Sequence, residues 1–214
     1  MRSLSVFLIA GLFVQAPATS GVIKIKIPIS EERGLRDWEL DGNGAWSVRG
    51  QSLILEKAGV PGGPIRRPAA LAIFRDRVLT DFELQVDVRS TAPTDLAVRD
   101  VLLIFGYQSP TQFYYVHLAA TTDPVHNGIF LVNNADRRRL DDAIAPARLT
   151  DQAWHRIRLE RQSARGTINV FFGDDPKPLL STTDRTLGSG RIGVGSFDET
   201  GEFRAFEVRE LARR

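Results

Sequence analysis

The chain of 214 residues contains no cysteine, so neither a disulfide bond nor thiolate chemistry is available to it. Its formal net charge is only +2, which gives no electrostatic basis for binding nucleic acid. No apolar run approaches the roughly 20 residues that a membrane-spanning helix needs. The glycine motifs that bind phosphates and the Gly-x-Ser-x-Gly motif of serine hydrolases are also missing. These absences leave a soluble globular domain whose stability comes from burial of a core.

The first 18 residues have the pattern of an export signal. Arg2 supplies a positive charge, residues 4–14 form an apolar run, and Ala16 and Ala18 provide a small-x-small cleavage site. A buried first strand or helix is the alternative for this run. We expect a signal peptide over residues 1–18, a mature domain over residues 19–214, and a secreted or periplasmic location.

Apolar and polar residues alternate along much of the mature chain. Residues 22–27, 82–89 and 154–160 each show the period of two that is typical of a half-buried strand. Residues 101–105 are apolar at every position, which indicates a central strand. Further strands are expected at residues 46–55 (a hairpin turning near Gly50), 112–118, 128–132, 167–172, 191–197 and 203–208, with a loop at residues 58–68.

No helical stretch of more than one or two turns is visible, and neither an internal repeat nor a linker divides the mature chain. Many strands joined by turns are typical of sandwiches and jelly rolls. The sequence therefore predicts one all-β domain, a sandwich of two antiparallel sheets.

Seven segments together form a pattern that covers most of the mature chain, and its most specific part is an aromatic strand that ends in a histidine. The segments are RD (99–100), FGYQ (105–108), FYYVHL (113–118), DPVHN (123–127), IFLVN (129–133), WHRIR (154–158) and GRIGVGSFD (190–198).

This pattern resembles the secreted 3-keto-disaccharide hydrolase-like family, within the concanavalin A-like lectin and glucanase superfamily. The resemblance implies a concanavalin-like jelly roll whose concave face commonly holds a glycan, but it implies no settled activity. Relatives often carry a histidine before the Arg-Asp pair, whereas this chain has Val98 there. Any role of that histidine is therefore not carried over to this sequence.

His117 is the leading candidate for a catalytic residue. Alternation along its strand places Phe113, Tyr115 and His117 on one face. An aromatic ring can stack on a pyranose while a neighbouring imidazole, whose pKa is near neutral, bonds its hydroxyls or acts as acid or base. The alternative is a buried histidine whose hydrogen bonds are made with the backbone.

Arg99 and Asp100 are the other candidate catalytic residues. They lie just before a central strand and could orient a sugar at the edge of the sheet; the alternative is a salt bridge that fixes the loop at residues 91–95. His126 could form a rim contact or pair with His117 on a metal ion, although no third ligand is evident. Besides Phe113 and Tyr115, the residues expected to contact substrate are Tyr107, Gln108, His126, Asn127 and Asp87.

Paired carboxylates of the glycosidase kind are not evident. Glu83 and Asp87 share a face, but four strand residues separate them by about 13 Å, and glycosidases need about 5–9.5 Å. A cross-strand pair of Asp87 with Asp100 or Glu160 stays open, because it depends on strand pairing. The Glu-x-Asp-x-x-Glu motif of family 16 glycosidases is absent.

Calcium is the candidate cofactor. Turn carboxylates offer hard oxygen ligands at Asp198 and Glu199, or at Asp174 and Asp175, although such groups are usually just solvated. The run of arginines at 137–139 is flanked by aspartates, which favours a solvated hairpin over an anion site.

Three functions are open on this evidence, and carbohydrate is the expected partner in two of them. The first is an exported enzyme that hydrolyses glycosides or 3-keto sugars, and the second is a non-catalytic glycan-binding module. The third is a structural envelope protein. A fold alone does not choose among these functions.

Overall fold

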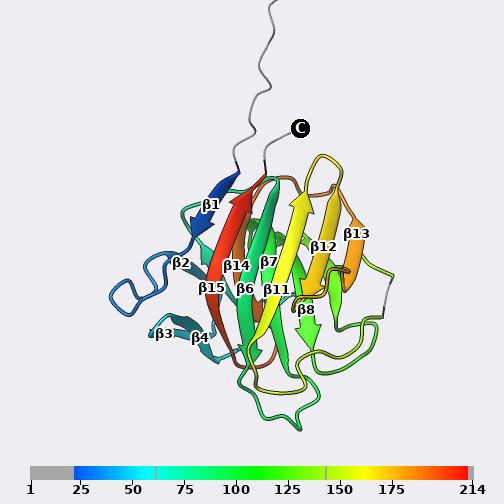
Figure 1. The fold of residues 1–214 in the computed structure, drawn as a ribbon. Helices are drawn as coiled ribbons and strands as arrows, with labels where there is room; N and C mark the ends of the chain where they lie inside the picture. Colours follow the sequence, from blue (N-terminus) through cyan, green and yellow to red (C-terminus); the bar gives the residue numbers. More distant parts are fainter. Residues whose placement is uncertain (1–21, 61, 143, 212–214) are drawn as a thin grey trace, which may run out of the picture.

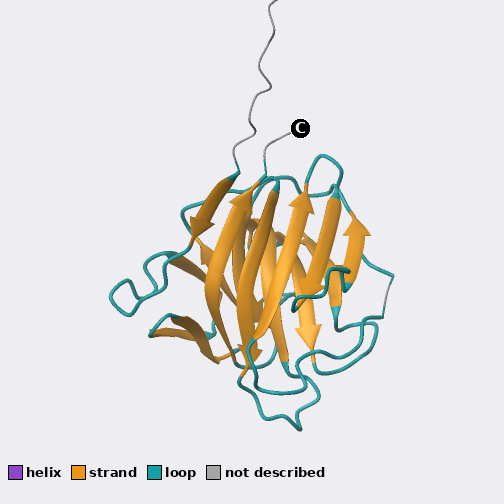
Figure 2. Ribbon diagram, in the orientation of Figure 1, coloured by secondary structure: helices purple, strands orange, loops and turns teal. Residues whose placement is uncertain are grey.

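The computed structural model describes residues 22–60, 62–142 and 144–211. The predicted signal peptide lies outside these residues. No helix occurs among the described residues, and strands joined by loops make up the whole drawing (Figure 2). The described part therefore also contains no helix long and apolar enough to cross a membrane.

Two antiparallel sheets pack face to face, as the sequence predicts (Figure 1). The eight-stranded sheet has the order β13-β12-β11-β6-β15-β4-β3, and β1 also pairs with β15. Its strands are β1 (Ile23–Lys26), β3 (Ala45–Arg49), β4 (Ser52–Lys57), β6 (Phe82–Ser90), β11 (His155–Gln162), β12 (Thr167–Phe172), β13 (Leu180–Thr183) and β15 (Gly201–Glu210).

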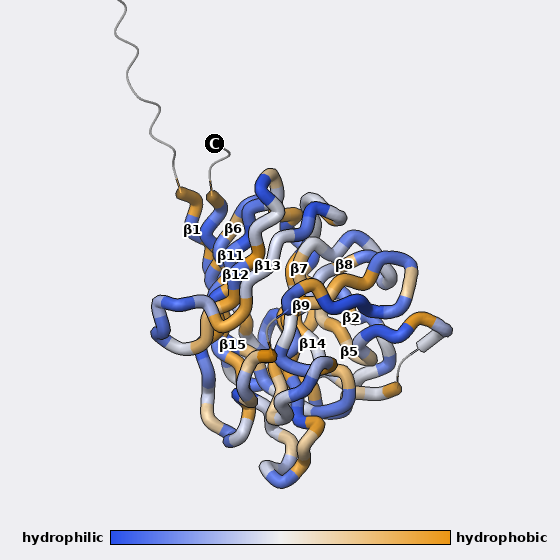
Figure 3. Tube along the Cα trace, turned by 90° about the vertical axis from the view of Figure 1, so that its right-hand side faces the viewer, coloured by the Kyte–Doolittle hydropathy of each residue, from blue (hydrophilic) through white to orange (hydrophobic). Residues whose placement is uncertain are grey.

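The seven-stranded sheet has the order β10-β9-β8-β7-β14-β5-β2. Figure 3, turned by 90°, places this sheet on one side of the molecule and the eight-stranded sheet on the other. Its strands are β2 (Trp38–Gly42), β5 (Ala70–Phe74), β7 (Asp100–Ser109), β8 (Gln112–Ala119), β9 (Gly128–Asn133), β10 (Arg138–Arg139) and β14 (Arg191–Ser196).

The main core lies between the sheets and follows the predicted alternation. Leu84, Val86 and Val88 of β6 pack there against Val101 and Leu103 of β7. The polar residues of β6 consequently lie on the outer face of the eight-stranded sheet.

A second apolar cluster covers the opposite, outer face of the seven-stranded sheet. We call it the outer aromatic cluster, and its members are fully or almost fully buried. They are Leu71, Ile73, Leu102, Ile104, Tyr107, Phe113, Tyr115, Phe130, Val132 and Phe197.

Loop residues seal this outer aromatic cluster from solvent. Ile65 packs against it. The adjacent Arg66 carbonyl accepts a hydrogen bond from the backbone amide of Arg137 (3.0 Å). The Arg67 guanidinium forms a two-pronged ion pair with Asp41 (2.9 and 3.0 Å). The described residues of the predicted loop, 58–60 and 62–68, contain no strand or helix, as predicted, and they also cover one face of the sandwich.

Candidate functional site

Several predicted site residues meet at one end of the seven-stranded sheet. Strands β7 and β9 begin there, and β8 and β14 end there, with β9, β8, β7 and β14 as neighbours. Loops gather at this end, which is the lower end of the molecule in Figure 1. The antiparallel order therefore brings Asp100 and the distant Asp198 together with His117 and His126, which flank the turn between β8 and β9.

The predicted face of strand β8 is confirmed, but the expected open groove is wrong. Phe113 and Tyr115 belong to the outer aromatic cluster, and their rings lie 6.2 Å apart. The His117 ring lies 6.2 Å from that of Tyr115. Both aromatic residues are fully buried, and His117 is only 2% exposed. The loops above the sheet close the face that alternation alone suggested would be open.

His117 is buried without a hydrogen-bond partner on either ring nitrogen. Its Nε2 lies 3.1 Å from Oδ2 of Asp100, but the direction of approach does not make a hydrogen bond. Burial lowers the pKa of His117, although Asp100 opposes this effect. Nearly all buried polar groups in native proteins have a partner, so this histidine is an exception that calls for an explanation.

Asp100 fastens the loop that follows strand β14. Its carboxylate accepts hydrogen bonds from the Ser196 hydroxyl and from the backbone amide of Phe197 (2.9 Å). The Phe197 ring then stacks on His117, with centroids 5.4 Å apart. Asp100 therefore positions both the imidazole and the residues beside it.

His126 is held in place by the loop that carries it. Asp123 lies 2.8 Å from Nδ1 of His126, and this contact lowers the pKa of Asp123 against the opposing effect of burial. Asn127, with a φ of 45°, accepts from the Ala119 amide (2.9 Å) and donates to the Thr121 carbonyl (2.6 Å). Asn127 thus closes the loop, and its amide is fully engaged there.

The His126 ring lies 5.0 Å from that of His117 and stays partly exposed, at 16% of its side-chain surface. Because Asp123 engages Nδ1, the proton of the neutral ring is expected on that nitrogen, which leaves Nε2 as an acceptor. No described residue is hydrogen-bonded to Nε2. His126 can therefore present one nitrogen to a ligand.

Arg137 lies over the outer aromatic cluster, contrary to the solvated hairpin predicted for residues 137–139. Its guanidinium carbon is 4.4 Å from the centroid of Phe197 and 5.0 Å from that of Phe130. One nitrogen donates to the Tyr115 hydroxyl (3.2 Å). Within the described chain no carboxylate lies at ion-pair distance from Arg137, so most of its donors are unengaged.

The neighbouring Arg139 clamps the histidine loop. It donates to the carbonyls of Pro124 (2.9 Å), His126 (3.1 Å) and Asn127 (3.1 Å), and it pairs with Asp141 (2.7 Å). Sequence reasoning missed both arginines, because charge patterning does not tell which residue of a run folds inward.

Asp198 is exposed, and its carboxylate makes no hydrogen bond with any described residue. Burial of part of the group and the charge of Asp100 raise its pKa, with His117, Arg137 and His126 acting in the opposite direction. We call the set Asp100, His117, His126, Arg137 and Asp198 the histidine corner.

The described residues contain no group of three or more His, Cys, Asp or Glu side chains arranged to hold a metal ion. The predicted metal pair of His117 and His126 therefore finds no third ligand in this part of the chain. Calcium at Asp198 and Glu199, or at Asp174 and Asp175, gains no support from this geometry and stays a prediction. Thermal unfolding with and without a chelator tests it.

Arg99 does not join the histidine corner. Its guanidinium donates to three carbonyls, those of Leu149 (2.8 Å), Asp151 (2.6 Å) and Ser90 (3.3 Å). Asp100, the next residue, faces His117 instead, because successive side chains of a strand point to opposite faces. The expected pairing of Arg99 with Asp100 is therefore wrong: Arg99 ties loops together through main-chain atoms.

Three further predicted contacts lie away from the histidine corner. The Tyr107 hydroxyl donates to Asp41 (3.4 Å), and Gln108 donates to the Ser189 carbonyl (3.0 Å). Asp87 belongs to the other sheet, so the open possibility of a carboxylate pair with Asp100 is wrong. In the pairing of β6 with β11, Asp87 lies opposite Arg156, and Glu160 lies opposite Glu83. Asp87 and Glu160 are therefore about 13 Å apart along the strands.

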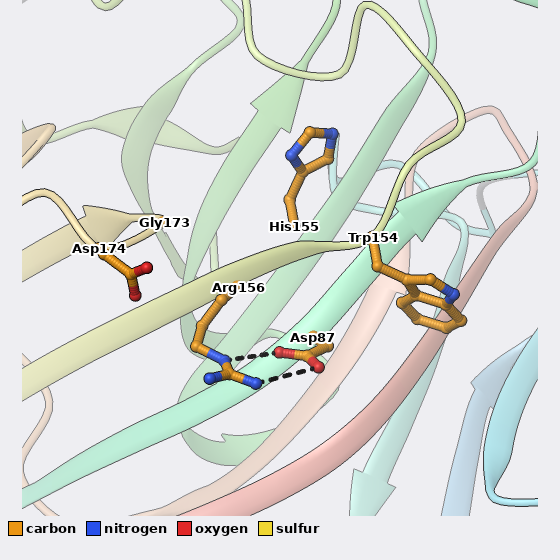
Figure 4. Close-up of a pocket in the computed structure, with 6 residues that line it drawn as sticks. All are labelled: Asp87, Trp154, His155, Arg156, Gly173 and Asp174. Carbon is orange, nitrogen blue, oxygen red and sulfur yellow. Dashed lines mark hydrogen bonds and ion pairs between the residues drawn. The ribbon is translucent and has the colours of Figure 1, made fainter.

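A pocket opens on the outer face of the eight-stranded sheet (Figure 4), where the sequence offered Asp87 as a substrate contact and Asp174 as a calcium ligand. Its lining residues are Asp87, Trp154, His155, Arg156, Gly173 and Asp174. Figure 4 shows Trp154 beside Asp87, Asp174 on the far side of Arg156, and the His155 ring turned away from that group. The sequence signal was Trp154, an aromatic residue on the polar face of an alternating strand.

Solved structures with the same architecture include carbohydrate-binding module CBM66 from Bacillus subtilis, with a TM-score of 0.64 and 14% identity, over 80% of this chain and 94% of that chain. Winged bean acidic lectin, complexed with methyl-α-D-galactose, matches with a TM-score of 0.59 and 11% identity, over 91% of this chain and all of the lectin. The fold is that of the concanavalin A-like lectins and glucanases.

The exoplasmic/lumenal domain of VIP36, in a form bound to Ca²⁺ and Man3GlcNAc, shares this concanavalin A-like fold at a TM-score of 0.56 and 13% identity, over 88% of this chain and 92% of that chain. No family model and no curated protein sequence matches the chain. At these identities the likeness concerns the fold.

The buried His117 predicts how stability depends on pH. Its pKa is lowered in the folded protein, so below its unfolded value of about 6.5 the unfolded chain binds a proton that the folded chain does not. The contribution of neutral His117 to the free energy of unfolding is therefore complete above about pH 6.5. It is lost as the pH falls from there through the pKa that His117 has in the folded protein.

Urea unfolding of the wild type and His117→Gln between pH 7.5 and 5, a range chosen to span about 6.5, checks this. The variant should lose less stability on acidification. Asp198 and Glu199, whose pKa values are raised by burial, act with the opposite sign in both proteins, and loss of the His117 charge raises the pKa of Asp198 further, which changes the comparison in the same direction. Equal slopes for the two proteins would contradict the prediction.

Proposed function

We propose that this protein is an exported, non-catalytic carbohydrate-binding module whose histidine corner contacts the glycan. One observation carries the proposal: a partly exposed donor, a partly exposed acceptor and an exposed carboxylate stand together with unengaged hydrogen-bonding groups. Arg137 has free guanidinium N–H groups, His126 has a free Nε2, and Asp198 has a free carboxylate. Hydroxyl groups both donate and accept, so vicinal hydroxyls suit such a mixed set.

The chemistry of these groups favours a neutral polyol over a simple anion. Arg137 alone would attract an anion, but Asp198 beside it would repel one. Phe197 is only 7% exposed, so stacking on a sugar ring contributes little at this corner. Most of the affinity is therefore expected from hydrogen bonds to charged groups, each contributing about 1.5–3 kcal/mol.

Binding is favoured over the catalysis expected for His117, since that imidazole is sealed from solvent and Arg99 is bound to main-chain carbonyls. His117 would then act behind the contact surface: with Asp100 it positions Phe197, His126 and Asp198. Its Nδ1 is buried without a partner, a cost in stability that a purely structural role does not explain.

Titration calorimetry against a panel of neutral oligosaccharides tests the proposal. Arg137→Ala should weaken binding about tenfold or more, as loss of a hydrogen bond to a charged group predicts, and His126→Ala, which removes a neutral acceptor, should weaken it about fivefold. The matched control is Arg138→Ala, because Arg138 is 62% exposed and lies 3.5 Å from its partner Asp184. Unchanged affinity in both corner variants would reject the site, and no binding of any saccharide would favour a structural envelope protein.

A second candidate function is cleavage of a 3-keto glycoside, which the resemblance of the sequence suggests. One observation favours it: the unpaired carboxyl of Asp198, whose pKa is raised by burial, lies within electrostatic range of the free Nε2 of His126, so the corner holds candidates for an acid and a base. His126 would take the proton from the carbon next to the ketone, and Arg137 would stabilise the enolate. Asp198 would protonate the departing glycosidic oxygen, and addition of water to the resulting enone would complete the hydrolysis.

Incubation with a 3-keto disaccharide separates the two candidates. Release of free sugar by the wild type, lost in Asp198→Asn while binding is retained, would favour the enzyme. Binding of plain and 3-keto sugars without turnover would favour the module.

A further inference from the structure

We propose that the pocket on the outer face of the eight-stranded sheet is a second saccharide subsite, specific for a neutral sugar unit. Its walls come from β6, β11 and the turn after β12. The ligand class, carbohydrate, is the same as in the proposed function, but this subsite does not depend on the histidine corner. The two sites lie at the same end of the sandwich on opposite outer faces.

The polar floor of the pocket is held together by ion pairs. Arg156 donates to both oxygens of Asp87 (2.9 and 3.3 Å), and this pair raises the pKa of the arginine (Figure 4). The Nε of Arg204 lies 3.9 Å from the same carboxylate. Charged side chains that hold one another in this way lose little conformational freedom when a ligand binds.

The aromatic wall is held as firmly. The guanidinium carbon of Arg204 lies 4.0 Å from the Trp154 ring centroid, and that of Arg89 lies 4.8 Å from it. Arg89 is itself fixed by Glu202 (2.8 Å). Trp154 stays partly exposed and supplies the apolar surface that a sugar C–H face requires.

Strand β15 has a β-bulge next to the pocket, and this bulge affects the direction of the Arg204 side chain. Strand β15 changes register against β6 between Arg204 and Glu207, and Ala205 within this bulge has a φ of 54°. Bulges re-aim side chains and are common next to binding sites. Here the bulge follows directly after the residue that contacts both Asp87 and Trp154.

The charges at the pocket balance, which decides the class of ligand. Arg156 and Arg204 are 48% and 43% exposed and share the single carboxylate of Asp87. Asp174 on the rim is exposed and forms no ion pair with any described residue. The pocket thus offers donors, an acceptor and a ring at no net charge, a set that fits vicinal hydroxyls and does not favour an acidic sugar.

The pocket has a volume of about 300 Å³. This is at the lower end of the sizes of ligand pockets. It therefore suits one small unit at the end or side of a glycan. A long chain would extend from it across the charged outer face of the sheet.

The test follows the indole N–H signal of Trp154 by NMR, identified with Trp154→Phe, while methyl glycosides of neutral sugars and of uronic acids are added. A neutral glycoside should shift this signal. Asp174→Asn should weaken the response about tenfold, and Arg137→Ala should leave it unchanged. Since Trp154 and Asp174 are not core residues, both variants should fold.

Three results would overturn the subsite: no neutral glycoside moves the Trp154 signal, Asp174→Asn responds as the wild type does, or uronates alone are bound. The amide of Phe197 reports on the histidine corner in the same spectra. A response of Trp154 without one of Phe197 would reject the corner and keep this subsite, and the reverse pattern would reject this subsite and keep the corner.

Discussion

Replacing Arg99 with alanine is expected to lower the free energy of unfolding by about 4 kcal/mol, because it removes charged hydrogen bonds from three main-chain carbonyls, of which those of Leu149 and Ser90 are buried. The guanidinium is fully buried and joins three segments, through Ser90, Leu149 and Asp151. Without it these carbonyls lose their charged donor in a place that water reaches poorly. Urea denaturation at neutral pH measures the change.

Two further variants sharpen this test. Arg99→Lys should lose nearly as much stability, because the ammonium group of a lysine cannot reach all three carbonyls that the planar guanidinium of Arg99 contacts. Arg138→Ala, on the exposed side of the same protein, should stay within about 0.5 kcal/mol of the wild type. If the free energy of unfolding of Arg99→Ala also stays within about 0.5 kcal/mol of the wild type, the hydrogen bonds of Arg99 do not stabilise these loops.

The second large effect is expected for Asp100→Ala, which should cost about 3 kcal/mol. The change leaves the Phe197 amide and the Ser196 hydroxyl without their buried acceptor. It also releases the loop that carries Asp198, so glycan binding should fall together with stability.

Asp100→Asn is the matched variant, because its amide oxygen can still accept from Phe197 while the second acceptor is lost. It should cost about half as much as Asp100→Ala. Asp95→Ala is the control, since Asp95 is exposed and makes no hydrogen bond or ion pair with any described residue. An Asp100→Ala protein as stable as Asp95→Ala would show that this carboxylate does not organise the corner.

Alternation in the sequence was sufficient to predict which way the strand residues face. It placed Leu84 and Val86 in the core, and it placed Tyr115 and His117 on the opposite side of their sheet from Tyr114 and Val116. The period of two is a local property of the backbone, so it needs no knowledge of the neighbours.

Alternation did not predict whether the face carrying His117 is open. That depends on the loop at residues 58–68 and on Arg137, which are far away in the sequence and have no periodicity. The strands β2 and β5 were also missed. Residues 70–74 are buried on both faces, so they show no alternation, and such a short apolar run is ambiguous.

Asp100 and Arg99 show the limit of reading neighbouring residues as a pair. Their charges suggest an ion pair, but the strand geometry sends them to opposite sides, each to partners that are set by tertiary structure. The pocket at Trp154 was missed for a similar reason, since its residues come from two strands and a turn.

A crystal structure of the protein with a bound neutral oligosaccharide would show whether the histidine corner holds the glycan. We expect sugar oxygens about 3 Å from the guanidinium of Arg137 and from Nε2 of His126. An oligosaccharide that is bound in the crystal but touches neither residue would contradict it.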